Sequence, residues 1–331
     1  MQRSITEMKT EHWALGEKTA HVARVESAML LGARKYFEKE GYYEICVPHI
    51  TRATGACENV DTLFEVDYFG QRGYLSQTGQ LYLESLIPKL GKLYTIGPSF
   101  RAEPDIDGRH LTEFTLVEIE LEIDFDNLLM EIENVVSSMF ESALEHASES
   151  IDALGGDIQT VERSINNFQR ISYDDAVQLL EKPFGVKWGD DLKSVHEQYI
   201  VKQHDNLPTF ITHFPKAIKF FNMKENEKRP ELVNSADLIV PLGGECVGAA
   251  EREYTYENVY RRLMESPMLA RLESKGGSIN DFDWYLNHLK KHGNVPHGGC
   301  GIGMSRVMQF VIGSNDIRES TTFPMNRITL I

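Results

Sequence analysis

The chain of 331 residues carries 50 acidic and 34 basic residues, a net charge of -16, and 41% of its residues are hydrophobic. The length and the hydrophobic content predict a folded protein with a sizeable core. The negative net charge is not typical of a protein whose main function is to bind polyanionic nucleic acid. No apolar run is long enough for a membrane span and no secretory signal is visible, so we expect a cytoplasmic location. The four scattered cysteines predict neither a disulfide framework nor a zinc site.

The first half of the chain alternates helix and strand patterns. Hydrophobic residues recur at helical spacing from Lys18 to Lys39, which predicts a long amphipathic helix. After it we expect, in chain order, a strand YYEICVPHIT with Pro48 near its end, short strands LFEVDYFG and RGYLS meeting near Gly70, a helix through TGQLYLESLIPKL, and strands KLYTIGPSFRAEP and HLTEFTLVEIELEI. The last two strands flank PDIDG and predict a hairpin with an extended loop.

The second half of the chain is patterned less evenly. We expect a helix from Phe125 to about Ser148, strands PTFITHFP and ADLIVP, helices from Asn258 to about Ser274 and from Ile279 to His292, and a strand GGCGIG that turns into the helix MSRVMQFVIG. The region from about 146 to 215, a peripheral region or insertion, has no fold that the sequence pattern assigns. Strands segregated from helices favour one α+β domain over residues 1–331, with a mainly antiparallel sheet flanked by helices.

The stretch FRAEPDIDGRHLTEF, Phe100 to Phe114, concentrates charged residues around a turn. If its start is extended, Arg101 and Glu103 share one face of the sheet. On the returning strand one parity holds Phe114, Leu116, Glu118, Glu120 and Glu122. Three acids in line beside an aromatic ring are costly to bury unless a cationic or donor-rich group lies on them, which favours a ligand-facing floor. The alternative is an exposed face of solvated charges.

Four stretches carry a family resemblance. The pattern F-R-A-E, loop, R-H-L-T-E-F resembles motif 2 of class II aminoacyl-tRNA synthetases of the aspartyl and asparaginyl branch. Asn294 to Pro324 resembles their motif 3, the segment from His49 to Glu84 their amino-acid-binding segment, and GECVGAAERE their acidic strand that binds metal and substrate. The resemblance runs from about Ala20 to the C-terminus, and it implies the class II catalytic fold.

The part before the first expected helix is short. Full synthetases of this branch carry an N-terminal OB-fold domain that reads the anticodon. We therefore expect no anticodon-binding domain and no tRNA partner here. The chain resembles more closely the archaeal-type stand-alone asparagine synthetases related to aspartyl- and asparaginyl-tRNA synthetases.

The resemblance implies an ATP site with Mg²⁺. Activating a carboxylate with ATP depends on positioning and on neutralising phosphate charge. By resemblance, Glu103 binds the adenine amino group and Phe114 stacks on adenine. Arg101 contacts the α-phosphate and the substrate carboxylate, Arg109 and His110 reach the distal phosphates, and Arg306, after the glycine turn at Gly303, reaches the γ-phosphate. The resemblance gives Asp237 and Glu245 as the ligands of Mg²⁺. The alternatives are an ion pair of Arg101 with Glu103 or Glu118, and two surface acids at strand ends.

The resemblance also implies an amino-acid pocket. Its expected residues are Glu58 and Gln77 at the α-amino group, Ser76 and Gln80 in the same segment, and Arg252 at a carboxylate. Aspartyl enzymes have a lysine that contacts the side-chain carboxylate where this sequence has Leu83, and this departure is asparaginyl-like. It leaves open which amino acid is bound and which of its carboxyl groups faces ATP.

Three functions remain open at this stage. In the leading hypothesis, aspartate or a close analogue is adenylated on its β-carboxylate and the acyl group passes to ammonia or another small amine. The α-carboxylate then lies on Arg252, and Glu118 is the proton acceptor. In the second, asparagine is activated on its α-carboxylate and transferred to a tRNA or a carrier. In the third, a catalytically silent paralogue binds an amino acid or nucleotide and regulates a partner.

The first helix and the strand after it resemble motif 1 of the family, with Pro48 as its signature proline. In class II enzymes this element forms the subunit interface, so the resemblance implies a C₂ homodimer. The alternative is a helix buried within a single chain.

Overall fold

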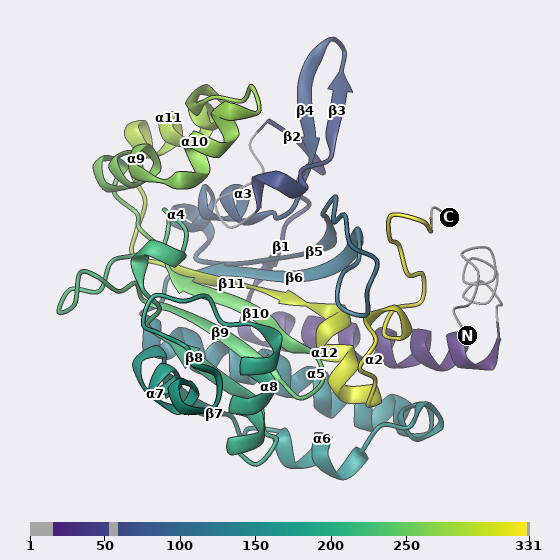
Figure 1. Cartoon of the computed structure of the whole chain (residues 1–331). Coiled ribbons are helices and arrows are strands. Elements are labelled where there is room, and N and C mark those ends of the chain that lie inside the picture. The colour runs from purple at the N-terminus through teal and green to yellow at the C-terminus, as the bar shows by residue number, and fades with distance from the viewer. Residues whose placement is uncertain (1–15, 53–58, 330–331) are drawn as a thin grey trace.

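The computed structural model describes residues 16–52 and 59–329. An eight-stranded sheet with the strand order β1-β5-β6-β11-β10-β9-β8-β7 organises it (Figure 1). The pairings from β5 through to β8 are antiparallel, and β1 and β7 join the two edges in parallel. A small sheet has the order β2-β4-β3. The expected α+β class, a mainly antiparallel sheet flanked by helices, is confirmed.

The strands of the large sheet are β1 (Tyr43–Glu44), β5 (Lys92–Phe100), β6 (Glu113–Leu121), β7 (Gln169–Ser172), β8 (Thr209–Thr212), β9 (Ser235–Val240), β10 (Gly244–Glu251) and β11 (Gly298–Gly303). Those of the small sheet are β2 (Ile50–Thr51), β3 (Glu65–Tyr68) and β4 (Gln71–Leu75).

The α-helices are α2 (Glu17–Glu40), α3 (Gln80–Glu84), α4 (Ile87–Leu90), α5 (Phe125–Leu154), α6 (Ile158–Ser164), α7 (Tyr173–Phe184), α8 (Ser194–Gln203), α9 (Tyr256–Glu265), α10 (Pro267–Ser274), α11 (Asp283–His292) and α12 (Met304–Ile312). Short 3₁₀ helices are η1 (Val60–Thr62), η2 (Lys216–Ile218), η3 (Ile279–Phe282) and η4 (Ile317–Glu319). Among the described residues, none of these helices combines the length and apolarity that crossing a membrane requires.

Helices α2 and α5 lie together on one side of the large sheet (Figure 1). Their backbones approach closely, because a Cβ atom added to Gly32 would lie 2.3 Å from the carbonyl oxygen of Ser138. Ser142 donates a hydrogen bond of 2.6 Å to the carbonyl oxygen of Ala28. The Asp124 side chain caps the start of α5, and Gly155 ends the helix in the left-handed conformation.

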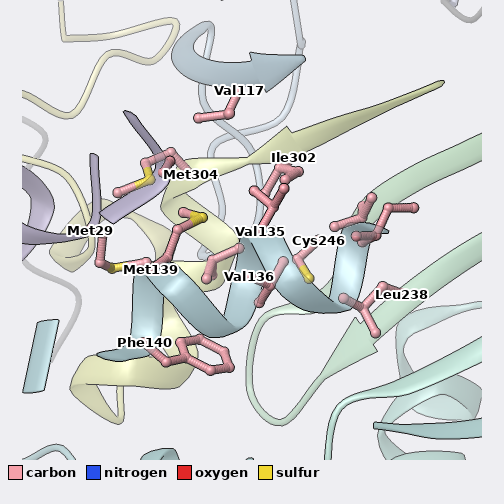
Figure 2. Packing of buried hydrophobic residues seen from close by; sticks show 14 of the residues in the cluster. Met29, Val117, Val135, Val136, Met139, Phe140, Leu238, Cys246, Ile302 and Met304 are labelled. Atoms are coloured by element: carbon pink, nitrogen blue, oxygen red, sulfur yellow. The ribbon is translucent and has the colours of Figure 1, made fainter. Parts of the chain in front are cut away.

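The main hydrophobic core fills the space between these helices and the sheet. Figure 2 shows part of it, with Val135, Val136, Met139 and Phe140 of α5 gathered near side chains of the sheet. The odd positions of β6, namely Val117, Ile119 and Leu121, belong to this core. Because side chains alternate along a strand, the even positions of β6 face the other side of the sheet.

Several expected elements are confirmed. The helix from Lys18 to Lys39 matches α2, and the hairpin matches β5 and β6, paired from Lys92 with Leu121 to Phe100 with Glu113. Beyond Phe100 the backbone leaves the ladder, although the Arg101 amide still donates to the Thr112 carbonyl at 2.9 Å. Glu122 lies beyond β6 and is exposed, so the expected row of acids is one residue too long.

Three expected elements are wrong, and each contains a proline. The strand YYEICVPHIT is divided into β1 and β2, which belong to different sheets, because Pro48 between them has no N–H for a ladder. The helix through TGQLYLESLIPKL is two helices, with Pro88 in the first turn of α4. The helix expected from Asn258 to Ser274 is likewise split, and α10 begins at Pro267.

The region from about 146 to 215 is part of the large sheet. Its strand β8 pairs antiparallel with β9, and β7 pairs parallel with β8. Helices α7 and α8 pack on these strands around Tyr173, Leu180 and Ile200. The region therefore supplies one wall of the cavity described next.

Candidate active site

The polar face of the large sheet forms the floor of a cavity of about 430 Å³. This volume lies within the range of small-molecule and cofactor sites. Most of the predicted site residues line it, namely Gln77, Gln80, Arg101, Glu103, Arg109, His110, Phe114, Glu118, Asp237, Glu245, Arg252, Gly303 and Arg306. Ser76 is buried behind the lining and donates to the Thr78 carbonyl oxygen at 2.6 Å. Glu58 lies outside the described residues.

Arg101 enters the cavity where β5 ends. Its guanidinium carbon lies 5.4 Å from the centre of the Phe114 ring, and its buried Nε makes no hydrogen bond to any described residue. No described acid forms an ion pair with Arg101, so the alternative of a pair with Glu103 or Glu118 does not occur here. A buried donor of this kind requires an acceptor, and an anionic ligand would supply one.

The loop between β5 and β6 holds two more basic side chains at the cavity. The Asp107 carboxylate accepts hydrogen bonds from the backbone amides of Arg109 at 2.8 Å and His110 at 3.0 Å. Burial opposes its ionisation, but these bonds and the His110 ring hold the pKa of Asp107 below its usual value. The Arg109 guanidinium lies 3.7 Å from Glu197 on α8. The loop is thereby fixed with both basic side chains lining the cavity.

Arg306 is the third residue of α12, in the first turn after the Gly303 N-cap. Its guanidinium donates to the backbone carbonyl oxygen of Glu245 at 2.5 Å. Gly243 permits this arrangement, because a Cβ there would lie 2.3 Å from the Arg306 carbonyl oxygen. The unbonded N–H groups of a helix start favour a negative ligand at this end of the cavity.

The two predicted metal ligands have different surroundings. Both oxygens of Asp237 bind the Lys219 ammonium, at 2.6 and 2.7 Å, whereas no described side chain binds the Glu245 carboxylate. Burial raises the pKa of Asp237 to about 7; Lys219 opposes the shift and Glu245 adds to it. The backbone amide of Glu245 donates to Glu197 at 3.3 Å. Mg²⁺ prefers carboxylate oxygens as ligands. Glu245, with Glu197 beside it, therefore fits the ion. Asp237 does not fit it, because both of its oxygens are already bound to Lys219.

A buried ion pair closes the opposite end of the cavity. Arg252 donates to Glu120 at 2.6 Å and 3.2 Å, and the two residues are only 3% and 1% exposed. Burial raises the pKa of Glu120 to about 7, against the attraction of Arg252. Gly299 on β11 makes the room, since a Cβ there would lie 2.2 Å from the Glu120 carboxyl carbon.

A second buried acid, Glu84, lies behind this pair. It accepts hydrogen bonds from Gln80 at 2.5 Å and from the Tyr285 hydroxyl, and His297 Nε2 lies 3.5 Å away. Ligand-type atoms of Glu84, Glu120 and His297 lie within 4.8 Å of one another, a grouping that could hold a metal. The Arg252 guanidinium, 4.0 Å from Glu84, already supplies the positive charge there. We therefore regard this group as a buried polar cluster, of which Glu120 lines the cavity.

Two acceptors lie together on the side of the cavity formed by α3 and its preceding turn. Glu118 accepts hydrogen bonds from the Gly79 amide at 2.8 Å and from the Thr78 hydroxyl, and burial raises its pKa. Gln77 donates to Thr62, and its buried Oε1 has no hydrogen bond to a described residue. An ammonium group would satisfy that oxygen.

Leu83 does not take part in the cavity. It is fully buried and packs with Ile87 and Leu93 in a separate apolar cluster. The position at which aspartyl enzymes are expected to have a lysine thus provides no charge here.

Some residues of the cavity and of the polar cluster behind it were not predicted from the sequence. Glu120 stood on the predicted floor but had no role, whereas Lys219, Glu197, Glu84 and His297 were not identified. Gln80 and Glu84 are four apart in sequence, which is a detectable pairing on a helix. Glu197 gave no signal, because it lies in the region whose pattern assigned no fold.

Comparison with known proteins identifies the family. The family model described as "tRNA synthetases class II (D, K and N)" matches residues 6–327. The chain therefore belongs to the class II tRNA synthetases of the D, K and N group, as a catalytic core that closely resembles asparaginyl-tRNA synthetase.

Three similar proteins are asparaginyl enzymes. The chain is 37% identical over 310 residues to the asparagine–tRNA ligase of Pyrococcus furiosus, covering 93% of this chain and 68% of that protein. The structure of asparaginyl-tRNA synthetase from Pyrococcus horikoshii complexed with asparaginyl-adenylate matches with a TM-score of 0.86 and 35% identity, covering 95% of this chain and 70% of that one. The Entamoeba histolytica enzyme with asparaginyl-adenylate matches with a TM-score of 0.82 and 28% identity, covering 98% and 71%.

Proposed function

We propose that the chain activates asparagine on its α-carboxylate with ATP, forming asparaginyl-adenylate and pyrophosphate, and transfers the asparaginyl group to a tRNA. The Arg252–Glu120 pair is the observation that supports asparagine as the amino acid. It presents a donor and an acceptor side by side at the closed end of the cavity. A carboxamide needs both, since its oxygen accepts and its NH₂ group donates.

An aspartate side chain suits this end less well. Its carboxylate would have to approach Glu120, a second acid that already pairs with Arg252. Leu83 adds no positive charge to offset the repulsion. The α-carboxylate of a reversed aspartate on Arg252 would meet the same repulsion from Glu120.

The ATP half of the cavity supports the adenylation step. Arg101 would contact the α-phosphate and the attacking carboxylate, while Phe114 and Glu103 would bind adenine. Arg109, His110 and Arg306 would neutralise the outer phosphates. Gln77 Oε1 and Glu118 would hold the α-amino group. Magnesium on Glu245, with Glu197 nearby, would supply charge neutralisation on the phosphates when bound.

The names of the relatives favour tRNA as the acceptor, and they do not support the expectation that tRNA is absent. The net charge of -16 means that any tRNA would have to bind on local basic surface. The proposed subunit arrangement is a homodimer through α2 and the edge strand β1.

A second candidate keeps the adenylation and changes the acceptor, so that aspartate and ammonia give asparagine. This candidate is favoured by the buried Glu118 carboxylate, which could accept the amine proton because burial raises its pKa. Against it, Glu118 is already held by Thr78 and Gly79.

Product analysis separates the candidates. The purified chain is incubated with ATP, Mg²⁺ and either asparagine with tRNA or aspartate with ammonium, and the products are identified by mass spectrometry. We expect asparaginyl-tRNA and AMP in the first mixture only. Free asparagine formed from aspartate would replace the proposal with the second candidate. Absence of AMP in every mixture would favour the third hypothesis, a catalytically silent paralogue.

A further inference from the structure

A lysine lies in the cavity without a role in the function proposed above. Lys219 follows η2 in the segment that joins β8 to β9, and its side chain is 13% exposed. It lines the same cavity as Arg109, Glu245 and Arg306. Burying an ammonium is costly unless charge and hydrogen bonds compensate it, so the surrounding groups must hold it there.

Two neighbours fix the ammonium group. Its Nζ lies 2.7 Å and 2.6 Å from the two oxygens of Asp237, and 3.9 Å from the centre of the Phe214 ring. An ammonium has three N–H donors, and no described residue other than Asp237 accepts a hydrogen bond from it. One donor is therefore available to a ligand in the cavity.

The other lysines of this segment do not share this position. Lys216 pairs with Glu225 at 3.0 Å and Lys224 with Glu251 at 2.7 Å, and neither lines the cavity. Of these three lysines, only Lys219 lines the cavity.

The opposite strand leaves space beside the pair. Asp237 on β9 lies across from Gly248 on β10, which has no side chain and is exposed to the cavity. A Cβ at Gly248 would lie 3.6 Å from the Glu245 carboxylate oxygen. The floor between Lys219 and Glu245 is open to a ligand.

We propose that Lys219 is a phosphate-binding residue of the ATP site and that Asp237 is its positioning residue, not a ligand of magnesium. This inference rests on the proposed ATP-dependent function. The Lys219 ammonium already binds the Asp237 carboxylate. A magnesium ion bound to that carboxylate at about 2.1 Å would lie within about 5 Å of the ammonium, and the two cations would repel each other. The divalent ion instead binds Glu245, and Lys219 adds a fixed positive charge for the phosphates.

The test uses the full chain and ligand binding, without turnover. The main variant is the double change Lys219→Met with Asp237→Asn, which removes the ammonium without leaving a buried carboxylate unpaired. Lys216→Met is the matched control, since it is the same change in the same segment outside the cavity. Dissociation constants for ATP and for adenosine are measured by calorimetry, and Mn²⁺ binding without nucleotide is measured by electron paramagnetic resonance. Circular dichroism checks folding.

We expect the double variant to bind ATP about tenfold more weakly, with adenosine binding unchanged, because the lost contact is to phosphate. Its Mn²⁺ affinity should stay within about threefold of the unaltered chain, whereas Glu245→Gln should lower it about tenfold or more. Lys219→Arg should restore most of the ATP affinity, since a charged donor remains.

Two results would overturn the inference. Unchanged ATP affinity in the double variant would leave Lys219 a structural residue, and loss of Mn²⁺ binding equal to that of Glu245→Gln would make Asp237 a metal ligand. Failure of the folded, unaltered chain to bind ATP is a different result, which rejects the proposed function itself.

Discussion

At the scale of single residues, strand parity predicted much of the site. Glu118 and Glu120 lie on the cavity floor because alternate side chains of β6 point to one face, and this period is readable from sequence. The contacts of each residue were not readable. Glu120 binds Arg252, which is 132 positions away, and such pairing depends on the register of β6, β11 and β10. Lys219 was missed because its segment has no periodic pattern.

Glu120→Gln tests the assignment of the amide-binding end. The change keeps the shape but removes the charge that excludes aspartate, so we expect the preference for asparagine over aspartate to fall by about 10- to 100-fold. The measurement is the ratio of kcat/KM for the two amino acids. Glu122→Gln is the control, because Glu122 has the same parity but is exposed beyond the strand. An unchanged ratio in Glu120→Gln would place the side-chain pocket elsewhere.

The pH dependence of asparagine binding follows from the same residue. The pKa of Glu120 is raised to about 7, so its carboxylate forms as the pH rises through that value. Because the ionised form is the better acceptor for the amide NH₂ group, asparagine affinity should increase from about pH 6 to pH 8. Calorimetric titration at several pH values checks this. If the asparagine affinity of Glu120→Gln depended on pH as steeply as that of the unaltered chain, the titrating group would be a different residue.

At the scale of elements, sequence pattern found helices and strands but not their interruptions. The hairpin of β5 and β6 was predicted because two runs that contain β-branched and aromatic residues flank the turn sequence PDIDG. The breaks near Pro48, Pro88 and Pro267 were missed, because each of these segments was predicted as a single element, whereas β5 continues through Pro98. In the region from 146 to 215 the two strands have four residues each, too short for a clear period, so their place in the sheet depends on pairing with β9.

The crossing of α2 and α5 gives a stability prediction. In Gly32→Ala the new methyl group would overlap the Ser138 carbonyl oxygen, and this clash should outweigh the better helix propensity of alanine. We expect the free energy of unfolding to fall by about 1–3 kcal/mol, the usual cost of overpacking. Urea unfolding measures it. Ser27→Ala, at an exposed position of the same helix, should change it little; equal effects of the two variants would mean that the helices are not in close contact.

At the scale of the whole molecule, the proposed homodimer places α2 and β1 at a subunit interface. Leu31 on α2 is 42% exposed and Tyr43 on the edge strand β1 is 55% exposed, although both are large and apolar. A second subunit covering this face would bury both side chains.

Substitution of this face tests the subunit arrangement. We expect the chain to be a dimer by light scattering and Leu31→Glu with Tyr43→Glu to shift it to the monomer, because a charge at such a contact is costly to bury. Phe69→Glu is the control, since Phe69 is 89% exposed at the turn between β3 and β4. A monomeric unaltered chain, or a double variant that stays dimeric, would contradict the arrangement.

The exchange of labelled pyrophosphate into ATP is the most direct test of asparagine activation, because it reports reversible adenylation without any acceptor. We expect exchange that depends on asparagine, with aspartate at least about tenfold less effective, and we expect Arg101→Ala to abolish the exchange. Exchange supported by aspartate and not by asparagine would reject asparagine as the activated amino acid.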